Sequence, residues 1–334
     1  MPVSILLLAS LLTPVAYGFG PDTKLAYSFD VKFNGFLPIM GGNQGEAKVH
    51  MDVAVTGKAA EDGKLKAASE IQQFEVEFNG AKLPFGVDNV TEYFPKTNIT
   101  LDPTGKILTS DAPDKKLPVR LPGLDVKHFP DITYVPIELP NDGIEVGKEW
   151  KFSRDFGGAP IEYQCKAESV DGNNWIFAVK LKQSYTVYES PQFEVVAKKE
   201  DAVNETTTTM TGDGHVTFDS SAGKVIKATM TNTAVSDAKD LTTGEVKQRK
   251  LTTDYSISLK DKPASNRAIN PAPTGSLWEQ SVGWANQAVQ IGRNAFAWLQ
   301  MASMFGLKAL PRELEAWVQP FKSSLRRWAP WLGT

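Results

Sequence analysis

The chain has 334 residues, enough for one large β domain or for two domains of ordinary size. Its 36 Lys and Arg residues against 39 Asp and Glu residues give a net charge of −3, which argues against the basic face of a nucleic-acid-binding protein. Cys165 is the single cysteine, which excludes an intrachain disulfide. An exported chain so poor in cysteine is typical of the bacterial periplasm or cell envelope.

Residues 1–18 hold an apolar run from Ile5 to Tyr17 that ends in the small-residue motif Ala16-Tyr17-Gly18. This pattern predicts a signal peptide cut near Gly18, although the usual positively charged start is missing. A buried first strand or helix is the alternative. No cysteine stands at the predicted cut, so we expect an exported protein of the periplasm or envelope without a lipid anchor on Cys.

Residues 24–260 alternate between apolar and polar side chains, the period of antiparallel β-sheet. Within 47–57, Val49 and Met51 fall on one face while Lys48 and His50 fall on the other, which indicates strands with one wet side. Turns are expected where Gly and Asp cluster, at 61–63, 171–173, 212–214 and 243–244.

Two stretches echo each other, NITLDPTGKIL at 98–108 and HVTFDSSAGKVI at 215–226. Each reads as a strand that ends in Asp, followed by a turn, Gly-Lys and apolar residues. The echo predicts a first β half over 19–116 and a second over 145–260. The proline-rich stretch 117–144 between them is expected to be an extended crossover, since proline disfavours both helix and ladder.

The phrases LPNDGIEVGKEWKF at 139–152 and GHVTFDSSAGKVIKATM at 214–230 resemble those of a family of uncharacterised secreted bacterial β-sheet domains. The resemblance covers about 120 residues of the second half and is compatible with the half-barrel sheets of lipoprotein carriers. It implies a curved antiparallel sheet that closes over an apolar ligand, and it implies no known reaction. The expected fold is therefore mainly β, either one large curved sheet or two related half-barrel-like sheets.

Residues 261–275 are polar and proline-bearing, and read as a linker. Beyond it, Ser276 and Glu279 form a capping box, and apolar residues recur with helical spacing through 276–334. From Gly275 onward six cations stand against three anions, so this predicted amphipathic tail is basic. The side chains that we expect to contact an apolar ligand, a membrane or a partner are Trp278, Trp284, Leu314, Trp317, Val318, Phe321, Leu325, Trp328, Lys322, Arg326 and Arg327.

Catalytic motifs are weak. His215 stands near Asp213 and Asp219 and is the best candidate for a base or metal ligand, but the flanking glycines favour a turn followed by a strand. His50 and His128 read as solvated residues, and Cys165 as an inert strand residue. The chain lacks the G-x-S-x-G, H-E-x-x-H and G-x-x-x-x-G-K-[ST] motifs, so we expect no cofactor and no metal.

The function predicted from these patterns is non-catalytic binding of a hydrophobic ligand or membrane lipid, with the Trp-rich basic tail on an apolar surface. That surface is the protein's own concave sheet, a membrane interface or another protein. The main alternative is an assembly module whose tail docks on a partner or a second copy, and a hydrolase is less favoured.

Overall fold

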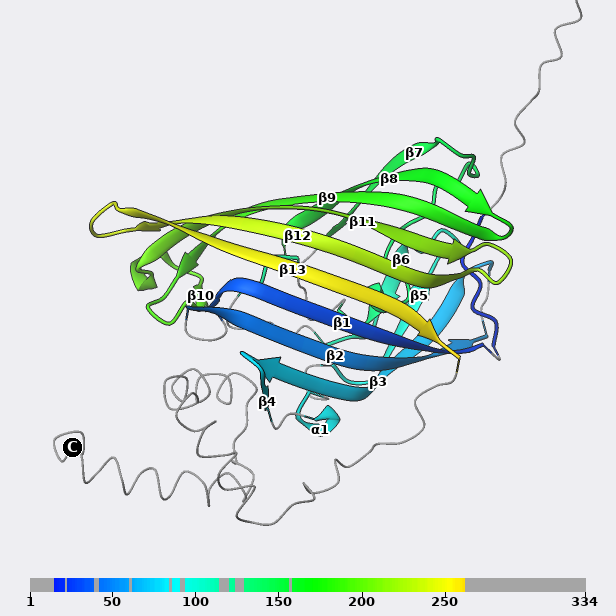
Figure 1. Cartoon of the computed structure of the whole chain (residues 1–334), viewed down its shortest axis with the longest axis horizontal. Helices are drawn as coiled ribbons and strands as arrows, with labels where there is room; N and C mark the ends of the chain where they lie inside the picture. The colour runs from blue at the N-terminus through cyan, green and yellow to red at the C-terminus, as the bar shows by residue number, and fades with distance from the viewer. Residues whose placement is uncertain are drawn as a thin grey trace, which may run out of the picture.

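The computed structural model describes residues 15–21, 23–38, 42–59, 62–83, 86–90, 94–113, 120–123, 129–155 and 158–261. These residues build one antiparallel sheet of 13 strands (Figure 1). Its strands are β1 (Lys24–Leu37), β2 (Asn43–Lys58), β3 (Leu65–Phe78), β4 (Ala81–Leu83), β5 (Thr97–Leu101), β6 (Ile107–Ser110), β7 (Glu149–Asp155), β8 (Pro160–Asp171), β9 (Asn174–Glu189), β10 (Val195–Val196), β11 (Asn204–Asp219), β12 (Lys224–Asp240) and β13 (Val246–Lys260). Three short helical turns accompany them, α1 (Val87–Val90), η2 (Asp131–Thr133) and η3 (Lys199–Asp201).

The strand order is β6-β5-β3-β2-β1-β13-β12-β11-β9-β8-β7, with β4 and β10 added beside β3 and β9. The prediction of a large curved antiparallel sheet is confirmed. The alternative of two related sheets is wrong, because β1 pairs with β13 over ten residues and joins the two halves into one ladder. That pairing links residues more than 200 positions apart, so no local sequence pattern predicts it.

The inner face of the sheet carries the core. Along β8, Ile161, Tyr163, Cys165 and Ala167 are buried while the residues between them are exposed. This alternation puts the apolar set on one face, as the period of two requires. The strands sweep across the molecule as one curved surface, with β5 and β6 behind β11–β13 in this view (Figure 1).

Two segments outside the sheet cover its apolar inner face, the N-terminal residues 15–19 and the crossover residues 129–144, which include η2. Phe129 packs edge-on against Phe29 of β1, with ring centroids 5.2 Å apart. Phe19 packs in the same way against Tyr134, at 6.0 Å. The curved sheet therefore closes over its own chain, where the sequence suggested an apolar ligand.

The two edge strands, β6 and β7, stay apart because the crossover lies between them. Arg154 of β7 donates to the Val135 carbonyl at 2.7 Å and pairs with the Glu138 carboxylate at 3.2 Å. On the other side, Leu139 N–H donates to Thr104 O in the turn between β5 and β6. Burial raises the pKa of Glu138, against the opposing effect of Arg154. The sheet is thus held as an open half-barrel with a polar seam.

The predicted turn at 212–214 is wrong, since these residues lie in the middle of β11. The glycines serve close approach instead. A Cβ on Gly212 would stand 2.0 Å from Asn232 Oδ1, and one on Gly214 would stand 2.0 Å from the Thr229 carbonyl oxygen. The other turns are confirmed, with positive φ at Asp62 and at the glycines 63, 172 and 244.

Several predictions from the sequence lie outside the described residues. They are residues 1–14 of the predicted signal peptide, His128, the linker from residue 262 and the whole tail 276–334. Across the described residues, the structure contains no helix with the length and hydropathy needed to cross a bilayer.

Candidate functional site

A hollow of about 660 Å³ opens on the sheet, over β1–β3 and β11–β13. Each of these six strands lines it with three consecutive residues, such as 30–32 of β1, 75–77 of β3 and 213–215 of β11, and Lys82 of β4 adds one more. The outer residues of each triplet, such as Asp30 and Lys32, point to the polar face, and the middle one points to the core. The hollow therefore lies on the outer, polar face of the sheet.

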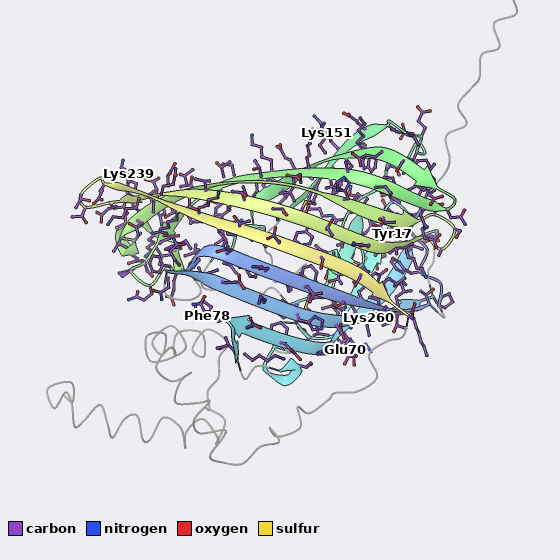
Figure 2. The ribbon with its side chains drawn as sticks, viewed as in Figure 1. Tyr17, Glu70, Phe78, Lys151, Lys239 and Lys260 are labelled. Carbon is purple, nitrogen blue, oxygen red and sulfur yellow. The ribbon has the colours of Figure 1, made fainter. Side chains whose placement is uncertain are left out.

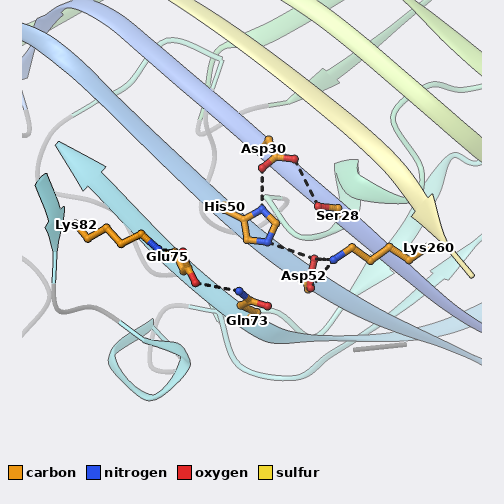
Figure 3. A network of polar contacts seen from close by, with 8 residues as sticks. All are labelled: Ser28, Asp30, His50, Asp52, Gln73, Glu75, Lys82 and Lys260. Atoms are coloured by element: carbon orange, nitrogen blue, oxygen red, sulfur yellow. Dashed lines mark hydrogen bonds and ion pairs between the residues drawn. The ribbon is translucent and has the colours of Figure 1, made fainter. Parts of the chain in front are cut away.

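His50 is the centre of a polar network in this hollow (Figure 3). Its Nδ1 lies 2.7 Å from Asp30 Oδ1 on β1, and its Nε2 lies 3.6 Å from Asp52 Oδ1, two residues further along β2. The buried Asp52 carboxylate also accepts from the Lys260 ammonium at 2.5 and 2.7 Å. The prediction that His50 lies on the wet face is confirmed, but its partners come from the register of β1, β2 and β13.

A second group of charges lies on β3 beside the first (Figure 3). Glu75 accepts from Lys82 at 3.0 Å and from Gln73 at 3.0 Å, and the Lys82 hydrogen bond holds its pKa below the usual value. Glu77 pairs with Lys48 of β2 at 2.8 Å. The two carboxylates that share one face in the sequence thus each have a lysine, which is ordinary cross-strand pairing.

His215 lies on the far side of the hollow, on β11. Its Nε2 is 3.2 Å from the Glu168 carboxylate of β8, and its side chain is 57% exposed. Asp219, one of the carboxylates expected near it, accepts instead from Ser221 and Ala222 in the following turn. His215 therefore contacts a carboxylate at the surface, and the described residues contain no group of three His, Cys, Asp or Glu side chains arranged for a metal ion.

Cys165 is buried among core residues, and this burial raises its pKa to about 12. A thiol with so high a pKa is a poor nucleophile at neutral pH, because the thiolate is the reactive form. The prediction of an inert strand cysteine is confirmed. The hollow thus offers paired charged side chains, and each of its histidines lies against a carboxylate. His50 contacts Asp30, whose other oxygen accepts from Ser28, and His215 contacts Glu168.

The inner face has a second, much smaller cavity of about 30 Å³, lined by residues that include Arg120, Tyr185 and Arg249. Arg249 pairs with Glu189 at 2.6 Å, and its guanidinium lies 4.6 Å from the centre of the Phe36 ring. Arg120 lies over the Tyr185 ring at 4.1 Å. A volume of this size admits one or two water molecules and no lipid chain.

The candidate contact residues of the tail, from Trp278 to Trp328, lie outside the described residues. The network around His50 and Lys260 on the outer face was not predicted. The alternation of residues could have placed Asp30, His50 and Asp52 on one face, but the pairing of β1 with β13 leaves no signal in one sequence.

Comparisons with known proteins give a distant likeness and no family. No family model matches the chain, and no curated protein matches it. Among solved structures, the chain is similar to one titled "Lipid-protein interactions in lipovitellin", with 12% sequence identity and a TM-score of 0.41. The match covers 78% of this chain and 27% of that one, so the chain spans about a quarter of its length. The resemblance to a family of secreted bacterial domains stays a prediction.

Proposed function

We propose that this protein is a non-catalytic, exported protein of the bacterial periplasm or envelope that attaches to a lipid surface through residues 276–334. The observation that supports the proposal is the filled inner face. Val15, Tyr17 and Phe19, together with Phe129 and the buried residues of 133–139, already cover the apolar side of the sheet.

The filled inner face matters because the tail needs an apolar surface. Leu314, Trp317, Val318, Phe321, Leu325 and Trp328 recur with helical spacing, and full burial of each such side chain contributes roughly 1.5 to 3 kcal/mol. One candidate surface was the concave face of the same sheet. Since residues 15–19 and 129–144 occupy that face, a membrane or a partner becomes the favoured surface.

Charge favours the membrane. Lys322, Arg326 and Arg327 stand off the apolar stripe in the sequence, and a cation near an anionic membrane contributes about 1 kcal/mol. Tryptophan prefers the headgroup level of a bilayer, where its ring and its N–H are both satisfied. The pattern is that of an in-plane amphipathic helix.

The side chains of the polar hollow support a non-catalytic function for the β-sheet domain. His50 and His215 are held by carboxylates, and Cys165 is buried and protonated. An assembly module that docks its tail on a partner protein is the second candidate, supported by the same filled face. A hydrolase is disfavoured, because the His215 side chain lies exposed at the surface beside Glu168.

Co-sedimentation of the full-length processed protein with vesicles tests the proposal. We expect strong binding to vesicles with phosphatidylglycerol and weak binding to pure phosphatidylcholine. Replacing Lys322, Arg326 and Arg327 together with Gln should weaken binding to the anionic vesicles by about 100-fold, since three cations contribute about 3 kcal/mol at most. The matched control replaces three exposed lysines of β8 and β9, at 166, 180 and 182, with Gln and should bind as before.

A second variant tests the apolar stripe. Trp317→Ser, Phe321→Ser and Trp328→Ser together should abolish binding to both kinds of vesicle. The exposed valines Val146, Val170 and Val246 provide the control when each is changed to Ser. Absence of vesicle binding by the unaltered protein would sink the lipid proposal. A defined protein partner lost with the tail variant would then favour the assembly module.

A further inference from the structure

The N-terminal residues 15–19 cross one end of the sheet, where three separate parts of the chain meet. Tyr17 N–H donates to Pro103 O in the β5–β6 turn, and Gly18 N–H donates to Gly223 O in the β11–β12 turn, both at 2.8 Å. The Tyr17 hydroxyl donates to the Ile137 carbonyl of the crossover at 2.9 Å. Figure 2 shows Tyr17 at the end of the sheet that holds Lys260, away from Lys239 and Phe78. This short segment thus joins both halves of the sheet and the crossover.

The two turns that hold the segment are the two stretches that echo each other in the sequence. In the first, Asp102 Oδ1 accepts from the N–H groups of Thr104 and Lys106. In the second, Asp219 Oδ1 accepts from Ser221 and Ala222 in the same way. These aspartate-bridged turns present one carbonyl each to the N-terminal segment. The two echoing stretches thus form one binding site for residues 15–19, made of the turns that begin at Asp102 and Asp219. We call this site the socket.

Glycines at the socket let residues 17–20 approach closely, because a side chain at these positions would collide with them. A Cβ on Gly105 would stand 2.4 Å from Tyr17 Cε2, and one on Gly223 would stand 2.4 Å from Gly18 N. Both glycines also have positive φ, of 90° and 61°, which other residues rarely adopt. A Cβ on Gly57 of β2 would stand 2.0 Å from the Gly20 carbonyl oxygen. Three separate strands or turns thus fit closely around residues 17–20, one against the Tyr17 ring and two against the main chain.

The side chains of the segment belong to the core. Val15, Tyr17 and Phe19 are 6%, 3% and 2% exposed. The Tyr17 ring lies against Phe218 of β11 at 5.1 Å between centroids and against Phe19 at 6.1 Å. A cut after Gly18 would remove Tyr17, the donor to Pro103 O and Ile137 O, and Gly18, the donor to Gly223 O. Unpaired polar groups in a buried site are costly.

We propose that residues 15–19 are a permanent part of the mature fold, and that the cut which releases the predicted leader falls before Val15. The inference rests on the export proposed above. The reaction is hydrolysis of one peptide bond, in which water supplies the hydroxyl of the new carboxyl end and a proton of the new amino end. The Ala16-Tyr17-Gly18 motif, which approximates a cleavage signal in the sequence, is then a socket-binding motif.

Intact mass and N-terminal sequencing of the protein purified from the periplasm of a bacterial host, expressed from the full-length gene, test the cut. We expect a first residue at Val15 or earlier. A folded mature protein that begins at any residue from Ala16 to Phe19 would overturn the inference. A chain that keeps Met1 and stays in the cytoplasm would contradict the export, and with it the cut, but not the socket.

Substitutions in the full chain test the socket independently of the export. Tyr17→Ala should lower the melting temperature by about 10 °C, because a buried aromatic ring is lost. Tyr17→Phe keeps the ring, removes only the bond to Ile137 O and should lower it by a few degrees, which covers the case in which the alanine variant fails to fold. Tyr188→Phe, on the half-buried part of β9, is the matched control. An unchanged melting temperature for both Tyr17 variants would overturn the socket.

Discussion

The two ends of the inner face differ in what fills them. At the end of the sheet near Lys260, which we call the aromatic end, the core includes seven aromatic side chains, Tyr17, Phe19, Tyr27, Tyr134, Trp175, Phe177 and Phe218. At the opposite end, the polar end, the same strands bury apolar residues such as Met210, Ala234 and Leu251 together with the polar side chains Gln183, Glu189, Thr206, Thr208, Asn232 and Thr253. One continuous sheet therefore buries large aromatic side chains at one end and a mixture of apolar and polar side chains at the other.

The difference places most of the stability at the aromatic end. Aromatic side chains bury large apolar surfaces, and their burial is the dominant favourable contribution to folding. Buried polar groups contribute little even when paired and cost free energy when they are not. At the polar end, the Thr206 hydroxyl and the Asn232 Oδ1 have no hydrogen-bond partner among the described residues, and at the aromatic end the Thr133 hydroxyl has none either. The polar end is thus the part of the sheet that we expect to open first.

The largest effect should come from Phe177→Ala at the aromatic end. Phe177 is fully buried and contacts the rings of Trp150 and Trp175. Its truncation should lower the free energy of unfolding by about 3 to 5 kcal/mol, measured by urea denaturation. Tyr185→Ala at the polar end should cost clearly less, because this ring is only partly buried. Equal costs at both positions would contradict the comparison.

Arg249→Met should have the next largest effect, at the polar end. It leaves Glu189 with an uncompensated charge at a side chain that is 11% exposed. We expect a loss of about 3 kcal/mol, since breaking one partner of a buried ion pair is strongly destabilising. The double variant Arg249→Met and Glu189→Leu should recover most of this loss. A double variant as unstable as the single one would show that Arg249 acts through Phe36 and Phe193 instead.

Asp219→Asn tests the turn that holds the N-terminal segment, through its pH dependence. The hydrogen bond from Ser221 lowers the pKa of Asp219 in the folded protein. Its contribution is therefore present above the unfolded pKa of about 3.9 and is lost as the pH falls through the lower folded value. Between about pH 5 and pH 2 the stability of the unaltered protein should fall more steeply than that of the variant. Parallel curves would contradict this assignment.

The smallest expected change in the free energy of unfolding is an increase. Thr206→Val removes a buried hydroxyl without a partner among the described residues, and should raise the free energy of unfolding by about 1 kcal/mol. Thr208→Val is the matched control two residues away. Its hydroxyl is 2.7 Å from that of Ser236, so the same change should destabilise by about 1 kcal/mol. A loss of stability in Thr206→Val would show that this hydroxyl is satisfied.

The sequence predicted the fold class because the apolar period of two is a local property. It placed Val49 and Met51 on one face and His50 on the other, and it identified the inert Cys165. It misread Gly212 and Gly214 as a turn, because glycine also serves close approach within a sheet. It could not distinguish a leader from a core segment at residues 15–18, since both are short and apolar.

The sequence by itself determined the β character, the polar and apolar faces, and the echo between 98–108 and 215–226. These follow from side-chain periodicity and turn chemistry, which act between residues close in the chain. Only the tertiary structure decided that β1 pairs with β13, that Asp52 meets Lys260, and that the two echoing turns hold Tyr17 and Gly18. Such contacts join residues far apart in the chain, and they form because one large apolar face must be covered, which no local pattern can specify.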